Sequence, residues 1–312
     1  MSHFTDQLAA GVLSKGTPVL VGLDPRPDRL PAGLLSPADS QNPIHVANAY
    51  EVFCKGIIDV VATHVAVVKP QAAFFEQLGP PGMNALATVI RHATEQGLLV
   101  ILDGKRNDIG STAEGYAEAY LGRDHSAWGA DALTVSPYLG YDTLEPFLHA
   151  AAQHQAGVFV LVKTSNLAGK LQDLITTDGR KVYQHVAAQV QDQAHASRGA
   201  CGYGLAGAVV GATHAEQIAE LRSEMPSSWF LVPGFGSQGG TAADVAAAFD
   251  ERGLGAIINN SRGIIFAHAR KEYASQYGAT QWQQAVEAAT RDMIDQLRAE
   301  TPAGQLVTRN SW

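Results

Sequence analysis

Two acidic side chains and a lysine fall within one six-residue segment, Asp103-Gly104-Lys105-Arg106-Asn107-Asp108. The segment directly follows the apolar run at 98–102, which is typical of a buried strand. Because side chains alternate along a strand, we expect Asp103 and Lys105 to point to one side, with Asp108 just past the turn and able to fold back toward them. Charges at the end of an apolar strand are costly to desolvate. The grouping indicates a reactive site, with a structural ion pair or solvated loop charges as the alternative.

Eight short apolar runs recur along the chain, and each ends in a polar or glycine-rich segment. They lie at 18–23, 65–68, 98–102, 130–135, 158–162, 206–210, 229–232 and 256–258. The intervals between them are long enough for helices, and residues 44–64 and 282–297 carry helical apolar stripes. Runs with little polar alternation suit parallel strands covered on both faces. The pattern predicts the α/β class, as one (β/α)8 TIM barrel domain over residues 1–312.

The first three runs each end in charged residues. Asp24 follows the first run, Lys69 the second, and the segment with Asp103, Lys105 and Asp108 the third. Neighbouring strands lie about 4.8 Å apart, so these charges are expected on one arc of the barrel mouth, alternating in sign. Such a network can hold an ammonium beside a reacting atom with little reorganisation. A purely structural network is the alternative.

The opposite arc is predicted to bind a phosphomonoester. Gly234, Gly236 and Gly239 match a dinucleotide-type glycine pattern, but the pattern follows the seventh run, whereas a dinucleotide loop follows the first strand of its unit. Loops after strands seven and eight of a barrel commonly cradle phosphate. Residues 241–244 form a capping-box pattern that starts a helix, and Arg262 offers a bidentate guanidinium.

Between these arcs, Ser165 ends the fifth run and offers a donor and an acceptor to a flat heterocycle or amide, although serine also occurs there for turn reasons. Two loops depart from a minimal barrel. Residues 25–43 contain five prolines and are predicted to form an extended loop. Residues 166–198 form a long segment with a turn at 177–179, and we expect these insertions to shape a lid or an oligomer contact.

Composition narrows the class of protein and of ligand. The formal net charge is −8 and the pI is about 5.7, so the global field repels nucleic acid and an anionic ligand needs a local cationic pocket. We expect no nucleic-acid partner and no membrane span. The histidines show no compact metal-ligand spacing, so no metal is predicted. Cys54 and Cys201 lack partner spacing and are expected to be reduced thiols, which favours a cytoplasmic protein.

These segments together resemble the orotidine 5′-phosphate decarboxylases, in their longer bacterial and mycobacterial-type branch, over nearly the whole chain. The resemblance is carried by Asp-x-Lys-x-x-Asp-Ile at 103–109, Gly-Leu-Asp-Pro-Arg at 22–26, Val-Lys-Pro at 68–70, Lys-Thr-Ser-Asn at 163–166, Pro-Gly-Phe-Gly-Ser-Gln-Gly-Gly at 233–240 and Asn-Ser-Arg-Gly-Ile at 260–264. One departure is Leu167, where the family pattern has proline.

The resemblance implies decarboxylation of orotidine 5′-monophosphate to uridine 5′-monophosphate, the last step of de novo pyrimidine biosynthesis, without a cofactor. Lys105 would protonate the pyrimidine carbon that loses carbon dioxide, flanked by Asp103 and Asp108, with Lys69 completing the charged set. The implied substrate contacts are Asp24 and Lys69 on the ribose, Ser165 on the pyrimidine amide edge, and Gln238, Gly239 and Arg262 on the phosphate.

The resemblance also implies a homodimer with shared sites, in which Asp108 and Thr112 reach the neighbouring subunit's site. Two other functions stay open. A magnesium-dependent sugar-phosphate lyase of the hexulose-phosphate synthase type shares the Asp-x-Lys-x-x-Asp arrangement, although Ser165 and the glutamine-bearing phosphate loop favour a nucleotide. A catalytically silent barrel that only binds nucleotides is the second alternative.

Overall fold

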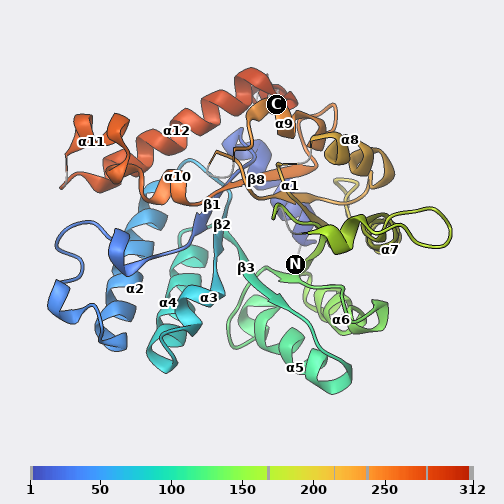
Figure 1. The fold of residues 1–312 in the computed structure, drawn as a ribbon, viewed down its shortest axis with the longest axis horizontal. Helices are drawn as coiled ribbons and strands as arrows, with labels where there is room; N and C mark the ends of the chain where they lie inside the picture. The colour runs from blue at the N-terminus through green and yellow to red at the C-terminus, as the bar shows by residue number, and fades with distance from the viewer. Residues whose placement is uncertain (1–2, 167–168, 214, 237–238, 279, 309–312) are drawn as a thin grey trace.

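The computed structural model describes residues 3–166, 169–213, 215–236, 239–278 and 280–308. Eight parallel strands close into a barrel in chain order, with β1 paired to both β2 and β8 (Figure 1). The strands are β1 Val19–Leu23, β2 Val67–Pro70, β3 Leu99–Arg106, β4 Ala132–Val135, β5 Gly157–Lys163, β6 Ala206–Val210, β7 Phe230–Val232 and β8 Ala256–Asn260. The predicted (β/α)8 fold and all eight predicted strand positions are confirmed.

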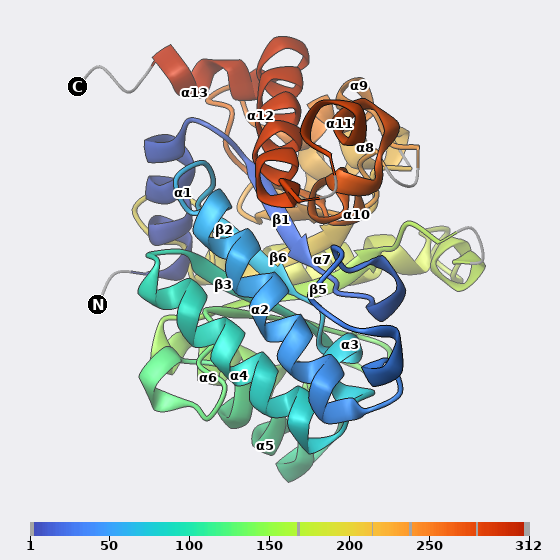
Figure 2. The same cartoon turned by 90° about the vertical axis from the view of Figure 1, so that its left-hand side faces the viewer.

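Helices surround the barrel, and α2 and α4 lie side by side on its outer face (Figure 2). They are α1 Phe4–Lys15, α2 Pro43–Val61, α3 Ala72–Glu76, α4 Pro80–Glu95, α5 Gly110–Tyr120, α6 Glu145–His154, α7 Val182–Ala196, α8 Ala215–Glu224, α9 Ala242–Val245, α10 Arg262–Ile265, α11 Lys271–Tyr277, α12 Trp282–Glu300 and α13 Gln305–Thr308. The predicted stripes at 44–64 and 282–297 correspond to α2 and α12. No helix in the described ranges is long and apolar enough to cross a membrane.

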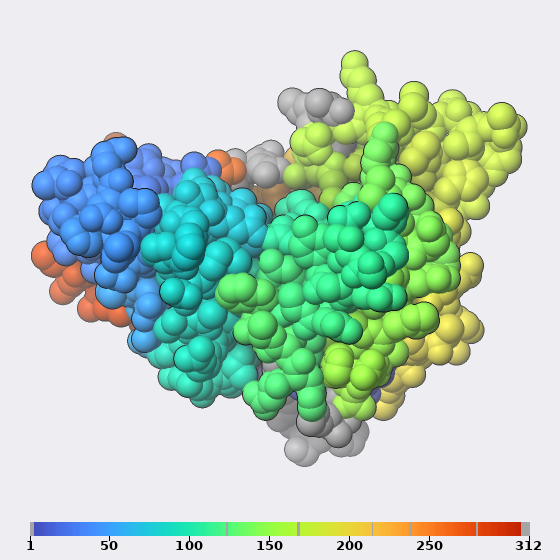
Figure 3. All heavy atoms as spheres, turned by 90° about the horizontal axis from the view of Figure 1, so that it is seen from below, coloured from blue at the N-terminus to red at the C-terminus, as the bar shows by residue number. Residues whose placement is uncertain are grey.

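The two predicted insertions have more regular structure than expected. The proline-rich segment contains two short 3-10 helices, Pro27–Arg29 and Pro37–Asp39, and Pro43 begins α2 with Asn42 as its cap. The segment after β5 projects beyond the rest of the molecule (Figure 3). It forms the predicted turn, in which the Gly179 N–H donates to the Thr176 carbonyl at 3.0 Å, but its second half is helix α7 rather than loop.

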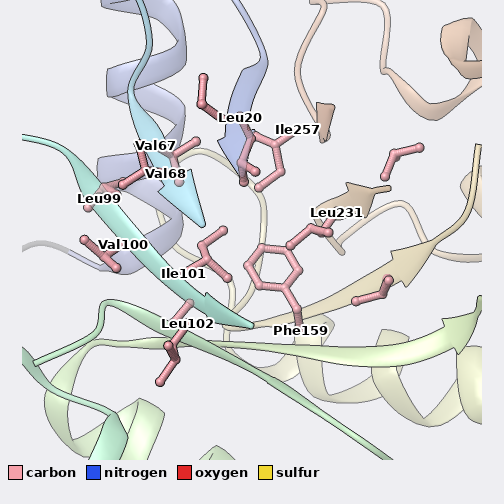
Figure 4. Close-up of a cluster of buried hydrophobic side chains, with 14 of the residues drawn as sticks. Leu20, Val67, Val68, Leu99, Val100, Ile101, Leu102, Phe159, Leu231 and Ile257 are labelled. Carbon is pink, nitrogen blue, oxygen red and sulfur yellow. The ribbon is translucent and has the colours of Figure 1, made fainter. Parts of the chain in front are cut away.

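Apolar side chains from the strands fill the barrel, with Phe159 near the centre of the cluster (Figure 4). Phe4 of α1 packs edge-on against Phe159, with ring centroids 6.2 Å apart, so α1 covers the end of the barrel opposite the polar strand ends. Cys54 is a buried free thiol, and burial raises its pKa. Cys201 is a half-buried free thiol. Neither of these two cysteines forms a disulfide in the described part of the chain.

Candidate active site

Strand β3 is longer than the sequence predicts and carries two of the candidate charges within it. It continues to Arg106, and its pairing with β4 is irregular between Leu102 and Arg106. Within this irregularity Lys105 has φ of 46°, a left-handed conformation that is uncommon outside glycine. The Lys105 N–H donates to the Thr134 hydroxyl at 3.0 Å, which holds the backbone in this conformation. Strain of this kind is concentrated at functional sites.

The Asp103 carboxylate lies between two ammonium groups. Its Oδ1 accepts from Lys105 Nζ at 2.6 Å, and its Oδ2 accepts from Lys69 Nζ at 2.6 Å. Lys69 belongs to the neighbouring strand β2, so the predicted gathering of strand-end charges is confirmed for these three residues. Charge-assisted bonds of this length are among the strongest that proteins make.

Two further residues hold the Asp103 carboxylate, and the sequence analysis did not identify them. The Gln71 amide donates to Oδ2 at 2.9 Å, and the Thr134 hydroxyl donates to Oδ1 at 2.9 Å. Each carboxylate oxygen therefore accepts one ammonium and one neutral donor, which fixes the orientation of the carboxylate. The available sequence signals were weak: Gln71 follows Val-Lys-Pro, and Thr134 is the one hydroxyl residue of an otherwise apolar strand.

Burial distinguishes the two lysines. The side chains of Lys69 and Asp103 are 4% and 10% exposed, whereas that of Lys105 is 47% exposed. Burial opposes the charge on Lys69, but the Asp103 and Asp24 carboxylates outweigh it, so the pKa of Lys69 lies above its usual value. Burial likewise opposes charge on Asp103, yet Lys69 and Lys105 hold the pKa of Asp103 well below its usual range. Lys69 neutralises the centre of the cluster, and Lys105 is the more accessible of the two ammonium groups to a bound molecule.

A cavity of about 410 Å³ opens over this cluster, within the size range of small-molecule sites. Its lining brings together most of the predicted site residues from both arcs, namely Asp24, Lys69, Asp103, Lys105, Ser165 and Arg262. Two of the lining residues, Asp24 and Asn259, each have a buried Oδ1 that has no hydrogen-bond partner in the structure. Buried acceptors of this kind are normally satisfied, so they are positioned to accept hydroxyl or amide donors from a ligand. Asn259 was not predicted.

The glycine-rich loop after β7 adopts the conformation that its glycines allow. Gly234, Gly236 and Gly239 all have positive φ, and Gly234 lines the cavity while Gly239 does not. The predicted capping box is confirmed: the Thr241 N–H donates to Asp244 at 2.8 Å and the Asp244 N–H donates back to the Thr241 hydroxyl at 3.3 Å. The helix that follows, α9, has only four residues. Gln238 and Leu167 lie outside the described residues.

Asp108 does not fold back toward the cluster, contrary to the expectation from its position after the turn. Its Oδ1 accepts from the N–H of Ile109, and Asp108 is absent from the described lining of the cavity. This local bond satisfies the carboxylate at the entry to α5 and directs it away from Asp103. Thr112 lies exposed in the first turn of α5. Neither residue joins the site within one chain.

Comparison with known proteins agrees with this geometry. A family model described as orotidine 5′-phosphate decarboxylase / HUMPS family matches residues 17–277. A protein from Rhodopirellula baltica named orotidine 5′-phosphate decarboxylase is 55% identical over 302 residues, covering 96% of this chain and 100% of that protein. A protein of the same name from Ralstonia pickettii is 40% identical and covers 95% of this chain and 99% of that protein.

The solved structure of Leishmania donovani OMP decarboxylase superimposes with a TM-score of 0.72 at 33% sequence identity, covering 96% of this chain and 98% of that chain. The matches extend over nearly the full length on both sides, and they include the strands that carry the charged cluster and the cavity. The chain therefore belongs to the orotidine 5′-phosphate decarboxylase family.

Proposed function

We propose that this protein decarboxylates orotidine 5′-monophosphate to uridine 5′-monophosphate and carbon dioxide, the last step of de novo pyrimidine biosynthesis. The observation that carries the proposal is the half-exposed Lys105 ammonium, held 2.6 Å from a buried carboxylate at the edge of a nucleotide-sized cavity. Family membership and the 55% identical relative support the same reaction.

In the proposed reaction the bond between the pyrimidine ring and its carboxylate breaks, and carbon dioxide leaves without the bonding electron pair. That pair stays in an orbital in the ring plane, where the π-system cannot delocalise it, so a fixed adjacent cation is the stabiliser that the site can supply. Lys105 Nζ provides this charge and then transfers one proton to the ring carbon. Asp103, bonded to both lysines, keeps the ammonium in place.

The substrate contacts are assigned from the family resemblance, and the lining of the cavity supports those of Asp24, Lys69, Ser165 and Arg262. Ser165 would bind the pyrimidine amide edge, and Asp24 with Lys69 would bind the ribose hydroxyls, which gives the buried Asp24 Oδ1 a donor. Arg262, together with Gln238 and Gly239, would bind the phosphate. Phosphate contacts far from the reacting carbon can drive closure over the substrate and so contribute to turnover.

We further propose a homodimer in which Asp108 and Thr112 complete the partner's site. Support comes from the outward placement of both residues and from the apolar side chains beside them. Ile109, Tyr138 and Leu139, in the loops after the adjacent strands β3 and β4, are 63%, 76% and 51% exposed. Exposed apolar groups of this size are typical of interaction surfaces. We also propose that the protein is cytoplasmic, because its two cysteines are free thiols. We propose that the chain forms one domain, because its eight strands belong to one barrel.

A subunit-mixing experiment tests the reaction and the shared site together. Lys105→Ala and Asp108→Ala variants should each be nearly inactive when the loss of the orotate chromophore is followed by ultraviolet absorbance. After the two are unfolded together and refolded at equal concentration, activity should return to about a quarter of the wild-type value, because half of the dimers are mixed and each has one intact site. Near-normal turnover by Lys105→Ala alone contradicts the mechanism, and absence of recovery contradicts the shared site.

The lyase alternative differs in its need for magnesium. Decarboxylation that is undiminished in excess chelator removes that alternative, because the lyase stabilises its enediolate with the metal. Any decarboxylation that depends on Lys105 removes the silent nucleotide-binding barrel.

A further inference from the structure

A second cavity, of about 500 Å³, adjoins the phosphate end of the first. Its wall includes Asn260, whereas the neighbours of Asn260 in the chain, Asn259 and Ser261, line the first cavity. Because side chains alternate along a strand, the second cavity lies on the outer side of β8. Its far wall is built by residues in or next to α10, α11 and α12, which lie together in the upper left of Figure 1. Arg262 lines both cavities, so the two meet at this residue.

The lining of the second cavity carries more positive than negative charge, although the whole protein has a net charge of −8. Three arginines line it, Arg29 from the loop after β1, Arg262, and Arg270 before α11. Among its described lining residues the one acid is Asp292, whose carboxylate accepts the Tyr273 hydroxyl at 2.6 Å. Guanidinium groups gathered around a concave site favour an anion, and their planar donors match phosphate oxygens.

Each of the two additional arginines is held in place. The Arg29 guanidinium lies over the Phe266 ring, 5.1 Å from its centroid, and Arg270 donates to the Gly263 carbonyl at 2.9 Å while it pairs with Glu272. Phe266 and Gly263 themselves line the cavity. Cations that are already oriented lose less entropy when they bind an anion than free side chains do.

We propose that this cavity receives the second phosphate of a uridine nucleotide with a longer phosphate chain, such as uridine 5′-diphosphate. The first phosphate stays at Arg262, and the second extends toward Arg29 and Arg270. The protein then binds product-related diphosphates as competitive inhibitors. This inference rests on the proposed function, since it takes Arg262 to be the phosphate ligand of the substrate.

Arg26 offers a matched control within the same loop. Its guanidinium also lies over an aromatic ring, 4.4 Å from the centroid of Phe74, but Arg26 is absent from the described lining of both cavities. If Arg29 only anchors the loop, replacing either arginine has the same effect on nucleotide binding. If Arg29 binds the second phosphate, only its own replacement changes the preference for a diphosphate.

The experiment measures the Kd of uridine 5′-monophosphate, uridine 5′-diphosphate and pyrophosphate by calorimetry, with decarboxylation and thermal unfolding measured on the same preparations. For the wild type we expect the diphosphate to bind about tenfold more tightly than the monophosphate, as one added charge-assisted contact provides. Arg29→Ala should lose most of this preference while its Kd for the monophosphate stays within about twofold. Arg26→Ala should keep the preference.

Several results overturn the inference. They are equal binding of both nucleotides by the wild type, an equal loss in Arg26→Ala, or pyrophosphate binding as tight as the diphosphate, which would indicate an anion site independent of the nucleoside. An Arg29→Ala protein that unfolds early is replaced by Arg29→Gln, which keeps a polar side chain of similar length. Absence of decarboxylation by the wild type contradicts the proposed function instead, since the binding measurements do not depend on turnover.

Discussion

Replacement of Asp103 by asparagine tests most directly how the charge pairs with Lys69 and Lys105 stabilise the site. The substitution keeps the shape of the side chain but removes the charge that lies 2.6 Å from both Lys69 and Lys105. Lys69 is then a buried cation without its main counterion, because its side chain is only 4% exposed. We expect loss of stability from Lys69 and loss of turnover from the released Lys105.

The magnitude follows from the geometry. Two unit charges at the observed 2.6 Å attract by about 6 kcal/mol at an effective dielectric constant near 20. Desolvation of both groups offsets part of this, and removal of one partner from a buried pair costs about 3–5 kcal/mol. Lys105 adds little, because solvent screens a side chain that is 47% exposed. The expected decrease in the free energy of unfolding is therefore about 3 kcal/mol at pH 7, at the lower end of that range because Asp24 still attracts Lys69.

The pH dependence has a definite sign. In the wild type the pKa of Lys69 is raised. Its contribution to the free energy of unfolding is therefore complete below pH 10.5 and is lost only as the pH rises through the pKa of the folded state. Because the pKa of Asp103 is lowered, its contribution to the free energy of unfolding is present above pH 3.8 and is lost as the pH falls through the pKa of the folded state. In Asp103→Asn we expect burial to lower the pKa of Lys69, because its main counterion is gone. The unfolded chain then binds more protons than the folded one, and the variant gains stability as the pH rises. The difference between the two proteins should narrow from pH 7 to about pH 9.5.

Urea unfolding at pH 7 and pH 9.5, at one protein concentration, measures this difference. The double variant Lys69→Met, Asp103→Asn is the control, because a neutral pair removes the uncompensated charge and should recover most of the lost stability. The reasoning is refuted if Asp103→Asn stays within about 0.5 kcal/mol of the wild type at both pH values, or if the double variant is no more stable than the single one.

Two further substitutions address the remaining parts of the site. Thr134→Val removes the hydroxyl that bonds both Asp103 and the Lys105 N–H, so it should cost about 1–2 kcal/mol in urea unfolding and lower kcat more than it raises KM. Thr290→Val replaces a buried threonine whose hydroxyl donates to the Val286 carbonyl of its own helix, and it should leave kcat unchanged. An equal fall in kcat in both variants would contradict the role of Thr134. Arg262→Ala should weaken binding of the phosphorylated substrate by about 2–4 kcal/mol, and an equal effect on phosphate-free orotidine in steady-state kinetics would contradict its assignment.

The barrel could be predicted from the sequence because each strand has two signals, an apolar run and a polar or glycine-rich segment at its end. The run at 98–102 is apolar enough to be buried on both faces. It is followed by charged residues, whose desolvation is costly and therefore indicates a site. Asp24 and Lys69 also lie at the ends of apolar runs. Their positions predicted which side of the barrel mouth carries the charged cluster. The order of strands in a barrel then follows the order in the chain, so the neighbours of each charge could be predicted without coordinates.

The supporting residues could not be predicted in the same way. Thr134 is a common residue in strands, and only the register of β4 against β3 places its hydroxyl beside Asp103. Gln71 lies between β2 and α3, and its side-chain oxygen also accepts from the Ala73 N–H at 3.4 Å, so its place in the sequence does not single it out as a partner of Asp103. Asp108 was misplaced because a local bond to the Ile109 N–H competes with the longer return to the cluster.

The conformation of Lys105 explains why a strand can present Asp103 and Lys105 as bonded neighbours. Residues two apart on a regular strand point to the same side but lie well separated along it, whereas these two charged groups are 2.6 Å apart. The left-handed φ of 46° breaks the regular rise of the strand, and the bond from the Lys105 N–H to Thr134 stabilises the break. The local strain at Lys105 is therefore the structural cost of holding a cation where the proposed reaction requires one.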